Sequence, residues 1–156
     1  MGGGKVDKET ARMATELGRR VAEAGYVLLT GGRPAGVMDA ASQGAHQAQG
    51  LVIGILPGPD PDDSSAFVDI VIATNLADGR NLINILSSDV VIACPGGAGT
   101  LTEVGMAIKN KKPLVLLNFD PGPTVLDAES QGRVIRASTP TEAMAAVQKF
   151  MEKIKS

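Results

Sequence analysis

Aromatic residues are scarce in this 156-residue chain, at 3% of the total, and tryptophan is absent. Proteins that bind single-stranded nucleic acids stack the bases on aromatic side chains and attract the phosphates with an excess of positive charge. Here 15 basic side chains face 17 acidic ones, for a formal net charge of -2. The composition therefore argues against nucleic acid as a partner.

Cysteine and histidine occur once each, as Cys94 and His46. One cysteine cannot form an intramolecular disulfide, and the two residues together are too few for a Cys/His metal cluster. We therefore expect no metal ligated by protein side chains and a reducing, cytoplasmic location. The first five residues, MGGGK, lack the apolar stretch of a secretory signal, so we expect neither export nor a membrane partner.

The length and composition are those of a globular protein with one core. Hydrophobic residues make up 44% of the chain and charged residues 21%, without low-complexity tracts. A chain of this length suits one domain, so we expect residues 1–156 to form a single Rossmann-like domain that binds a nucleotide or phosphate.

Apolar runs alternate with stretches of helical periodicity along the whole chain. The strands read as continuous apolar runs, such as VVIA and LVLL, which is typical of a sheet covered by helices on both faces. This order predicts an α/β fold with a three-layer, doubly wound, mostly parallel sheet, and ligands in such folds bind at the carboxyl ends of the strands. The predicted strands are 26–30, 51–56, 69–74, 89–94, 113–118 and 134–137, and the predicted helices are 7–24, 34–49, 75–86, 99–110 and 140–155.

The sharpest motif is PGGAGTLTE at residues 95–103, between a predicted strand and a predicted helix. Glycines let the backbone approach a ligand closely, and the start of a helix offers free N–H groups to an anion. We therefore predict that a phosphate binds here, with the ligand residues Gly96, Gly97, Ala98, Gly99 and Thr100. The alternative is a tight turn in which Thr100 and Glu103 form a T-x-x-E capping box.

Another glycine-rich turn, TGGRPAG at residues 30–36, also joins a predicted strand to a predicted helix. Two such turns at one edge of the sheet can line one cleft, which adds Gly31, Gly32 and Arg33 to the predicted ligand residues. Neither turn has the full dinucleotide fingerprint, because Thr102 stands where the third glycine of the PGGAGT motif belongs.

Arg80 and Asn81 precede the strand that leads into the PGGAGT turn, and they complete the predicted ligand residues. An arginine can hold a phosphate through two hydrogen bonds, and an asparagine can recognise a sugar or a base edge. The alternative is a solvated helix start with Asp78 as its cap. Glu103 is the one obvious candidate for a carboxylate that handles protons, and no nucleophile set of the Ser/His/Asp or Cys/His kind is evident.

These motifs together resemble the SLOG superfamily. The resemblance rests on the TGGR turn followed by Gly36, Val37 and Met38, on Arg80-Asn81, and on the PGGxGTxxE motif. The superfamily includes the LONELY GUY phosphoribohydrolases, often labelled possible lysine decarboxylases, and the molybdenum cofactor carrier proteins. LPGP at 56–59 and KKPLVLL at 111–117 are most similar to the carrier branch. That branch implies a dimeric or tetrameric homo-oligomer that binds the molybdenum cofactor (molybdopterin) through its phosphate and passes it to molybdoenzymes.

The hydrolase branch stays open as an alternative. It implies cleavage of the N-glycosidic bond of a nucleoside 5'-monophosphate, and not lysine decarboxylation, with Glu103 and Arg80 as catalytic residues. Glu103 matches the glutamate of that branch, whereas Arg80 stands in a DGRN context in place of GMHxRK and matches only loosely.

The beginning of the chain departs from the family pattern. The resemblance implies an apolar strand before the first glycine-rich turn, but here only Met1 precedes Gly2, Gly3 and Gly4. Without that strand we expect a gap in the centre of the sheet, with residues 2–5 forming a weakened part of the ligand site.

Overall fold

The computed structural model describes residues 1–155. Helices and strands alternate along the chain, as predicted. In chain order they are α1 (Lys8–Glu23), β1 (Leu28–Thr30), α2 (Gly36–Gln47), β2 (Val52–Leu56), η1 (Pro61–Asp63), β3 (Ile70–Ala73), η2 (Ala77–Gly79), α3 (Arg80–Ser87), β4 (Val91–Ala93), α4 (Ala98–Lys109), β5 (Leu114–Leu117), η3 (Pro123–Val125), α5 (Leu126–Ser130), β6 (Val134–Ala137) and α6 (Pro140–Lys155).

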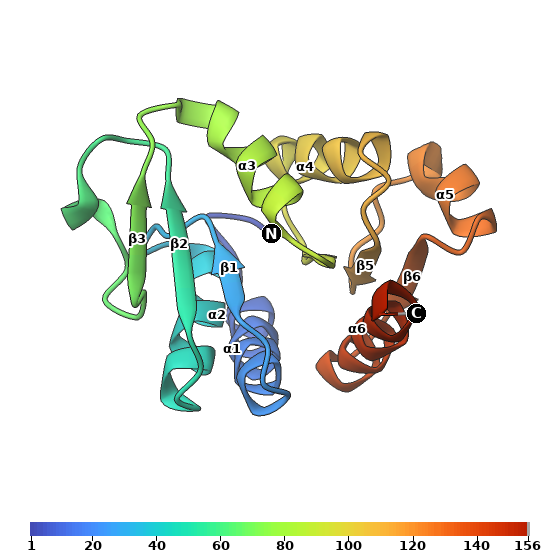
Figure 1. Ribbon diagram of the computed structural model, residues 1–156, viewed down its shortest axis with the longest axis horizontal. Coiled ribbons are helices and arrows are strands. Elements are labelled where there is room, and N and C mark those ends of the chain that lie inside the picture. Colours follow the sequence, from blue (N-terminus) through green and yellow to red (C-terminus); the bar gives the residue numbers. More distant parts are fainter. Residues whose placement is uncertain (156) are drawn as a thin grey trace.

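The strands form two sheets of three, in the orders β1-β2-β3 and β4-β5-β6. All four strand pairings are parallel, and their registers include Leu29 opposite Ile53 and Val115 opposite Ile135. The two sheets lie on opposite sides of the molecule with the amino terminus between them (Figure 1). The sheet is therefore parallel, as predicted, but it is divided in its centre.

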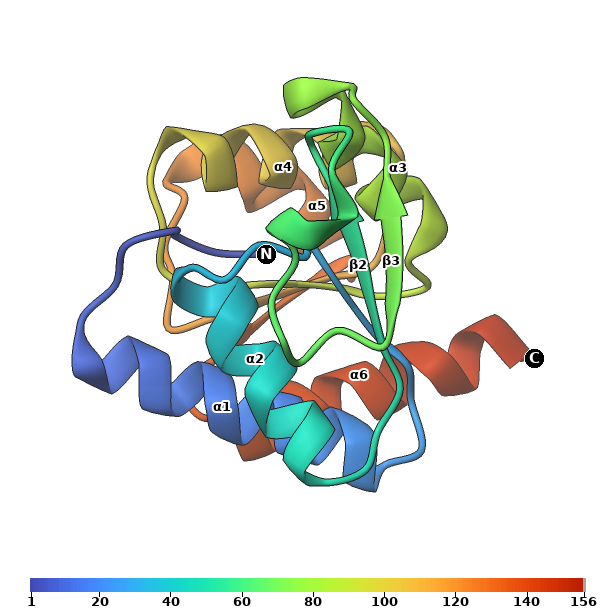
Figure 2. The ribbon, with the colours of Figure 1, turned by 90° about the vertical axis from the view of Figure 1, so that its left-hand side faces the viewer.

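Helices cover both faces of the strands. Figure 2 shows α3, α4 and α5 on one side of the sheets and α1, α2 and α6 on the other. Strand β5 illustrates the consequence, because Leu114 and Leu116 belong to the core cluster that includes residues of α3, α4 and α5, whereas Val115 and Leu117 belong to the cluster that includes residues of α1, α2 and α6. Each residue of β5 is thus buried, which explains its unbroken apolar sequence. The three-layer Rossmann-like fold is confirmed.

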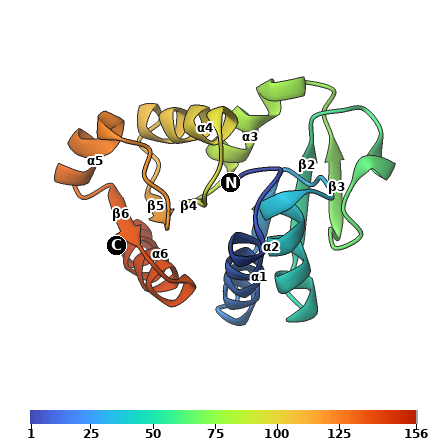
Figure 3. The same ribbon diagram turned by 180° about the vertical axis from the view of Figure 1, so that it is seen from behind.

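The first residues lie along the edge of β4. The amino group of Met1 donates to Ile92 O at 2.8 Å, and Cys94 N donates to Met1 O at 2.9 Å. Gly3 then connects the two halves, because its N–H donates to Pro95 O and its carbonyl accepts from Val37 N, both at 3.0 Å. The segment before α1 therefore reaches both glycine-rich turns, as the view from behind shows (Figure 3).

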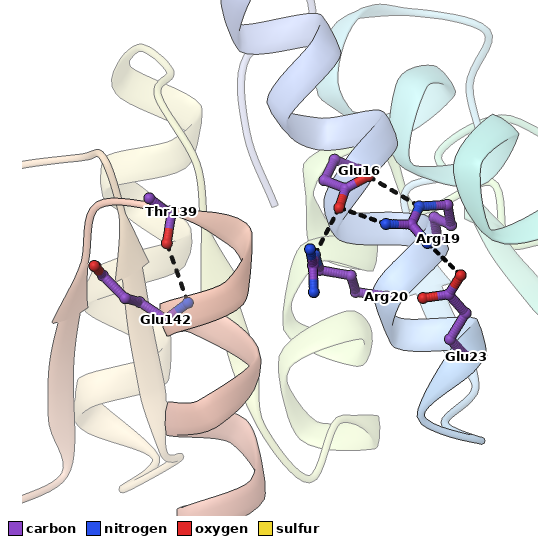
Figure 4. Close-up of polar contacts among 6 residues, drawn as sticks. All are labelled: Glu16, Arg19, Arg20, Glu23, Thr139 and Glu142. Carbon is purple, nitrogen blue, oxygen red and sulfur yellow. Dashed lines mark hydrogen bonds and ion pairs between the residues drawn. The ribbon is translucent and has the colours of Figure 1, made fainter.

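Helix α1 illustrates how local sequence defines these elements. Asp7 caps it by accepting a hydrogen bond from Thr10 N at 2.7 Å, and its buried face includes Leu17 and Val21. On its outer face, Glu16 accepts hydrogen bonds from Arg19 and Arg20, and Arg19 also donates to Glu23 (Figure 4). The hydrogen bond from Arg19 is the main reason why the pKa of Glu16 lies below its ordinary value. Ion pairs this exposed contribute little to stability.

One predicted helix starts later than expected, and one short helix was not predicted. The helix predicted over 75–86 begins only at Arg80, because Asn75 and Ala77 have φ angles of 53° and 46°, in the left-handed region where a helix cannot run. The short helix α5 was not predicted, since five residues are too few to show helical periodicity. Among residues 1–155, no helix combines the length and apolar character needed to cross a membrane.

Candidate functional site

A cavity of about 740 Å³ lies between the two halves, and the carboxyl ends of β1 and β4 open into it. Its lining brings together most of the predicted ligand residues, and Glu103 joins them. Gly2, Gly3 and Gly4 line it too, whereas Lys5 does not. Gly32, Gly96 and Ala98 belong to the same two turns but lie outside the lining. The predicted ligand residues within the lining are Gly31, Arg33, Arg80, Asn81, Gly97, Gly99 and Thr100.

The first glycine-rich turn, residues 30–36, follows β1, and its Gly31 lies against the side chain of Arg80. Gly31 is buried, and a Cβ added to it would lie 2.0 Å from the Arg80 Nη1 atom. Gly32 has a φ of 73°, and a Cβ added to it would lie 3.1 Å from the backbone of Gly54. The absence of a side chain at Gly31 thus leaves the space that the Arg80 guanidinium occupies.

Arg80 is a buried cation at the start of α3. Its side chain is 8% exposed, and Nη1 donates to Ile55 O at 3.1 Å. Burial lowers the pKa of Arg80, and the charge of Arg33 acts in the same direction, whereas Glu103 opposes them. Arginine nevertheless stays protonated in proteins, so the cavity holds a permanent positive charge with several donors.

The alternative of a solvated helix start capped by Asp78 was wrong. Gly79 is the N-cap of α3, without a side-chain hydrogen bond, and Asp78 lies in the preceding turn η2. The burial of Arg80 is equally inconsistent with a solvated helix start.

The second glycine-rich turn, PGGAG at residues 95–99, has open space around Gly97 and Gly99, whereas the glycines of the first turn are tightly packed. Gly97 is the N-cap of α4 and provides no side-chain hydrogen bond to the first amides of the helix. A Cβ added to Gly97 or Gly99 would meet nothing within 4 Å, and both residues are exposed. Gly96 differs, because its Cβ would lie 2.1 Å from Thr100 Oγ1. Within residues 1–155 the helix start therefore presents amides without a side-chain cap, and a positive dipole end, to the cavity.

The proposed capping box of Thr100 and Glu103 was wrong. Because Gly97 is the N-cap, Thr100 lies within the first turn of α4, where it is 3% exposed. The same T-x-x-E spacing does cap α6, where Glu142 N donates to Thr139 Oγ1 at 3.2 Å (Figure 4). The Glu142 carboxylate also accepts from Ser138 N at 2.7 Å. Glu103 is thus free of a capping role.

Glu103 adds a carboxyl group to the same cavity. Burial raises its pKa, and Asp78 acts in the same direction, whereas the amino terminus and Arg80 lower it. The carboxyl therefore lies in the field of two positive charges but takes up a proton more readily than in water. Such a group can accept a hydrogen bond from a sugar hydroxyl or an amine, or exchange a proton with a reacting group.

Asn84 was not predicted as a site residue. It lies one turn after Arg80 on α3, lines the cavity and is 8% exposed. Its Oδ1 atom is buried and has no hydrogen-bond partner within residues 1–155. The spacing of four residues from Arg80 on a helix places both residues on one face, which was the available signal.

The chain is similar in sequence and structure to known proteins. The SLOG cluster4 family model matches residues 1–144. The molybdenum cofactor binding protein of Rippkaea orientalis is 48% identical, with a TM-score of 0.90 over 97% of this chain and 94% of that one. The molybdenum cofactor carrier protein of Chlamydomonas reinhardtii is 44% identical, with a TM-score of 0.89 over 97% of this chain and 95% of that one.

A curated enzyme is a more distant relative. The cytokinin riboside 5'-monophosphate phosphoribohydrolase LOG5 of Arabidopsis thaliana is 35% identical over 115 residues, which are 69% of this chain and 50% of that protein. The chain thus spans about half the length of this enzyme. The predicted superfamily is confirmed, and with the family model matching nearly the whole length, the chain belongs to the SLOG cluster4 family.

Proposed function

We propose that this protein binds the molybdenum cofactor by its phosphate and carries it without altering it. The observation that supports this most is the pairing of a buried guanidinium, Arg80, with the open amides of Gly97–Thr100 in one cavity. A charged donor and free N–H groups at a helix start together match a phosphate.

The remaining cavity surface fits the rest of such a ligand. Asn81 and Asn84 offer polar groups beside the phosphate position, and Asn84 Oδ1 is open to a donor from a bound heterocycle. The molybdenum cofactor carries its own metal, so hydrogen bonds from the protein to the phosphate of the cofactor suffice for binding. The similarity to proteins named as binding or carrying the molybdenum cofactor supports this cargo over other phosphates.

The test is protection of the free cofactor against oxidation. Purified protein at saturating concentration should slow the oxidative decay of the free molybdenum cofactor, and Arg80→Met should lose that protection. Gln43→Ala, a change on the outer side of α2 away from this cavity, serves as the control. Decay at the same rate with and without protein contradicts the proposal.

Glu103 favours hydrolysis of a nucleoside 5'-monophosphate as a second candidate function. Its carboxyl and the Arg80 guanidinium line one cavity, which matches the need to stabilise charge at a ribose next to a bound phosphate. Incubation with AMP then releases adenine and ribose 5-phosphate, and Glu103→Ala abolishes the release. AMP that stays intact over hours excludes this activity for that substrate and leaves the carrier function.

We further propose that the protein is a homo-oligomer, dimeric or tetrameric, and passes its cargo to molybdoenzymes. Leucines on the outer sides of α3 and α4 support the assembly, since Leu82, Leu86 and Leu101 are 39%, 51% and 46% exposed and the two helices pack together. Light scattering during size-exclusion chromatography measures the molar mass of the assembly in solution. A monomer at micromolar concentration contradicts this part of the proposal.

A further inference from the structure

Both backbone hydrogen-bonding groups of Gly32, in the first glycine-rich turn, are engaged by the protein. Its N–H donates to Thr30 Oγ1 at 3.1 Å, and its carbonyl accepts from Ser65 N at 2.7 Å. Thr30 belongs to the turn itself, whereas Ser65 belongs to the loop between β2 and β3. The turn is therefore fixed at Gly32 both by its own first residue and by a residue of another loop.

The position of the Arg80 guanidinium depends on how this turn lies against β2. Arg80 Nη1 packs against Gly31 of the turn and donates to Ile55 O of β2 at 3.1 Å. Gly32 packs against the backbone of β2, so the turn cannot come closer to the strand. The hydrogen bond from Ser65 N holds the turn in that place. A shift of the turn would change the space that the guanidinium occupies.

Ser65 is itself anchored to helix α2. It is 1% exposed, and its Oγ atom donates to Asp39 Oδ1 at 2.6 Å. The same hydroxyl accepts a hydrogen bond from Phe67 N at 3.2 Å. The neighbouring Ser64 differs, because within residues 1–155 its hydroxyl makes no hydrogen bond. The hydroxyl of Ser65 thus connects this loop to α2, and that of Ser64 does not.

Helix α2 also holds the beginning of the turn. Ser42 Oγ donates to Met38 O at 2.8 Å and lies 3.4 Å from Thr30 Oγ1. Because the one proton of the Ser42 hydroxyl is used on Met38 O, Thr30 Oγ1 donates to Ser42 and accepts from Gly32 N. Two residues of one helix, Ser42 and Asp39, therefore hold the turn through hydroxyl groups.

We propose that Ser65, held by Asp39, is a positioning residue for the anion site, because it fixes the first glycine-rich turn and through it the Arg80 guanidinium. Ser65 and Asp39 both lie outside the cavity lining, so their effect on a bound phosphate is indirect. The inference rests on the proposed function only in that the cavity binds a phosphate. It gives the loop between β2 and β3 a part in binding.

The first comparison is Ser65→Ala against Ser64→Ala. Loss of the Ser65 hydroxyl leaves the Asp39 carboxylate without its partner and frees the loop, so affinity for inorganic phosphate should fall roughly tenfold by calorimetric titration. Hydrogen exchange of the Arg80 side-chain N–H groups, followed by NMR without ligand, should become faster because the bond to β2 weakens. Ser64→Ala should change neither quantity.

Asp39 provides the rescue. Asp39→Asn keeps an oxygen that accepts from Ser65 Oγ and should keep phosphate affinity within about twofold, whereas Asp39→Leu should match Ser65→Ala. Val115→Ala, in the core of β5, should lower Tm without changing Arg80 exchange or phosphate affinity.

Unchanged Arg80 exchange in Ser65→Ala overturns the proposal. An equal loss of phosphate affinity in Val115→Ala does so too, because it would show that general loosening of the fold causes the loss. Since Arg80 exchange is measured without ligand, its response to Ser65→Ala distinguishes this inference from the proposed cargo, which fails on the oxidation test alone.

Discussion

The two glycine-rich turns have similar sequences and opposite surroundings. In the first turn Gly31 and Gly32 are buried, and the space that Gly31 leaves open is filled by the guanidinium of Arg80. In the second turn Gly97 and Gly99 are exposed and have nothing within 4 Å of their missing side chains. One turn therefore positions a protein cation, and the other leaves its backbone free for a ligand. Glycine therefore allows a side chain to pack closely in the first turn and allows a ligand to reach the backbone in the second.

The largest effect should come from Gly31→Ala. The added methyl would lie 2.0 Å from Arg80 Nη1, so the guanidinium must leave Ile55 O or the turn must shift. We expect a loss of about 1–3 kcal/mol in the free energy of unfolding, as for other overpacked sites. Phosphate affinity should fall more than tenfold, since Arg80 is displaced. Urea denaturation and calorimetric titration with inorganic phosphate measure the two effects.

The matched change in the second turn is Gly99→Ala. Its methyl meets no protein atom within 4 Å and lies in a helix, where alanine is favoured by up to about 1 kcal/mol. Stability should therefore stay equal or rise, while phosphate affinity falls because the methyl covers the amides. Similar losses of stability in both variants would remove the distinction between the turns.

Arg80→Met should produce the next largest effect. Methionine keeps much of the apolar stem but removes the charge and the donor to Ile55 O. Charge-assisted hydrogen bonds contribute about 1.5–3 kcal/mol, so phosphate affinity should fall roughly 10- to 100-fold. Arg33→Met is the control, because Arg33 is exposed beside the same cavity and its contribution should vanish in high salt. Equal losses in the two variants contradict a special role for the buried cation.

The smallest effect should come from Glu103→Gln, and it should depend on pH. Burial raises the pKa of Glu103 in the folded protein, so its contribution to stability is fully present below the pKa of the unfolded chain and is lost as pH rises through the folded pKa. At pH 7 the glutamine variant should therefore be the more stable protein, by about 1–3 °C in Tm. The advantage should disappear on acidification. A pH-independent difference would show that packing, not charge, separates the two proteins.

Much of the fold could be predicted from the sequence. Continuous apolar runs identified every strand, because in a sheet covered on both faces each residue is buried, as in β5. The start of α3 was missed because Asn75 and Ala77 adopt left-handed backbone angles that their residue types do not signal.

The site was predictable only in part. Glycine-rich turns between strand and helix are local features, so both turns could be located from the sequence alone. The burial of Arg80 could not be, since it depends on Gly31 beneath it and on a carbonyl 25 residues away in β2. The unpaired Oδ1 of Asn84 likewise results from packing between distant elements.

The most direct test of the central claim follows the backbone amides of α4 by NMR during titration with inorganic phosphate or pyrophosphate. The largest changes in chemical shift should fall on Ala98, Gly99 and Thr100, the first residues of α4. The Arg80 side-chain N–H signals should shift over the same concentration range. Saturable binding that shifts other amides and leaves these three unchanged would contradict the assignment of the second turn as the phosphate site.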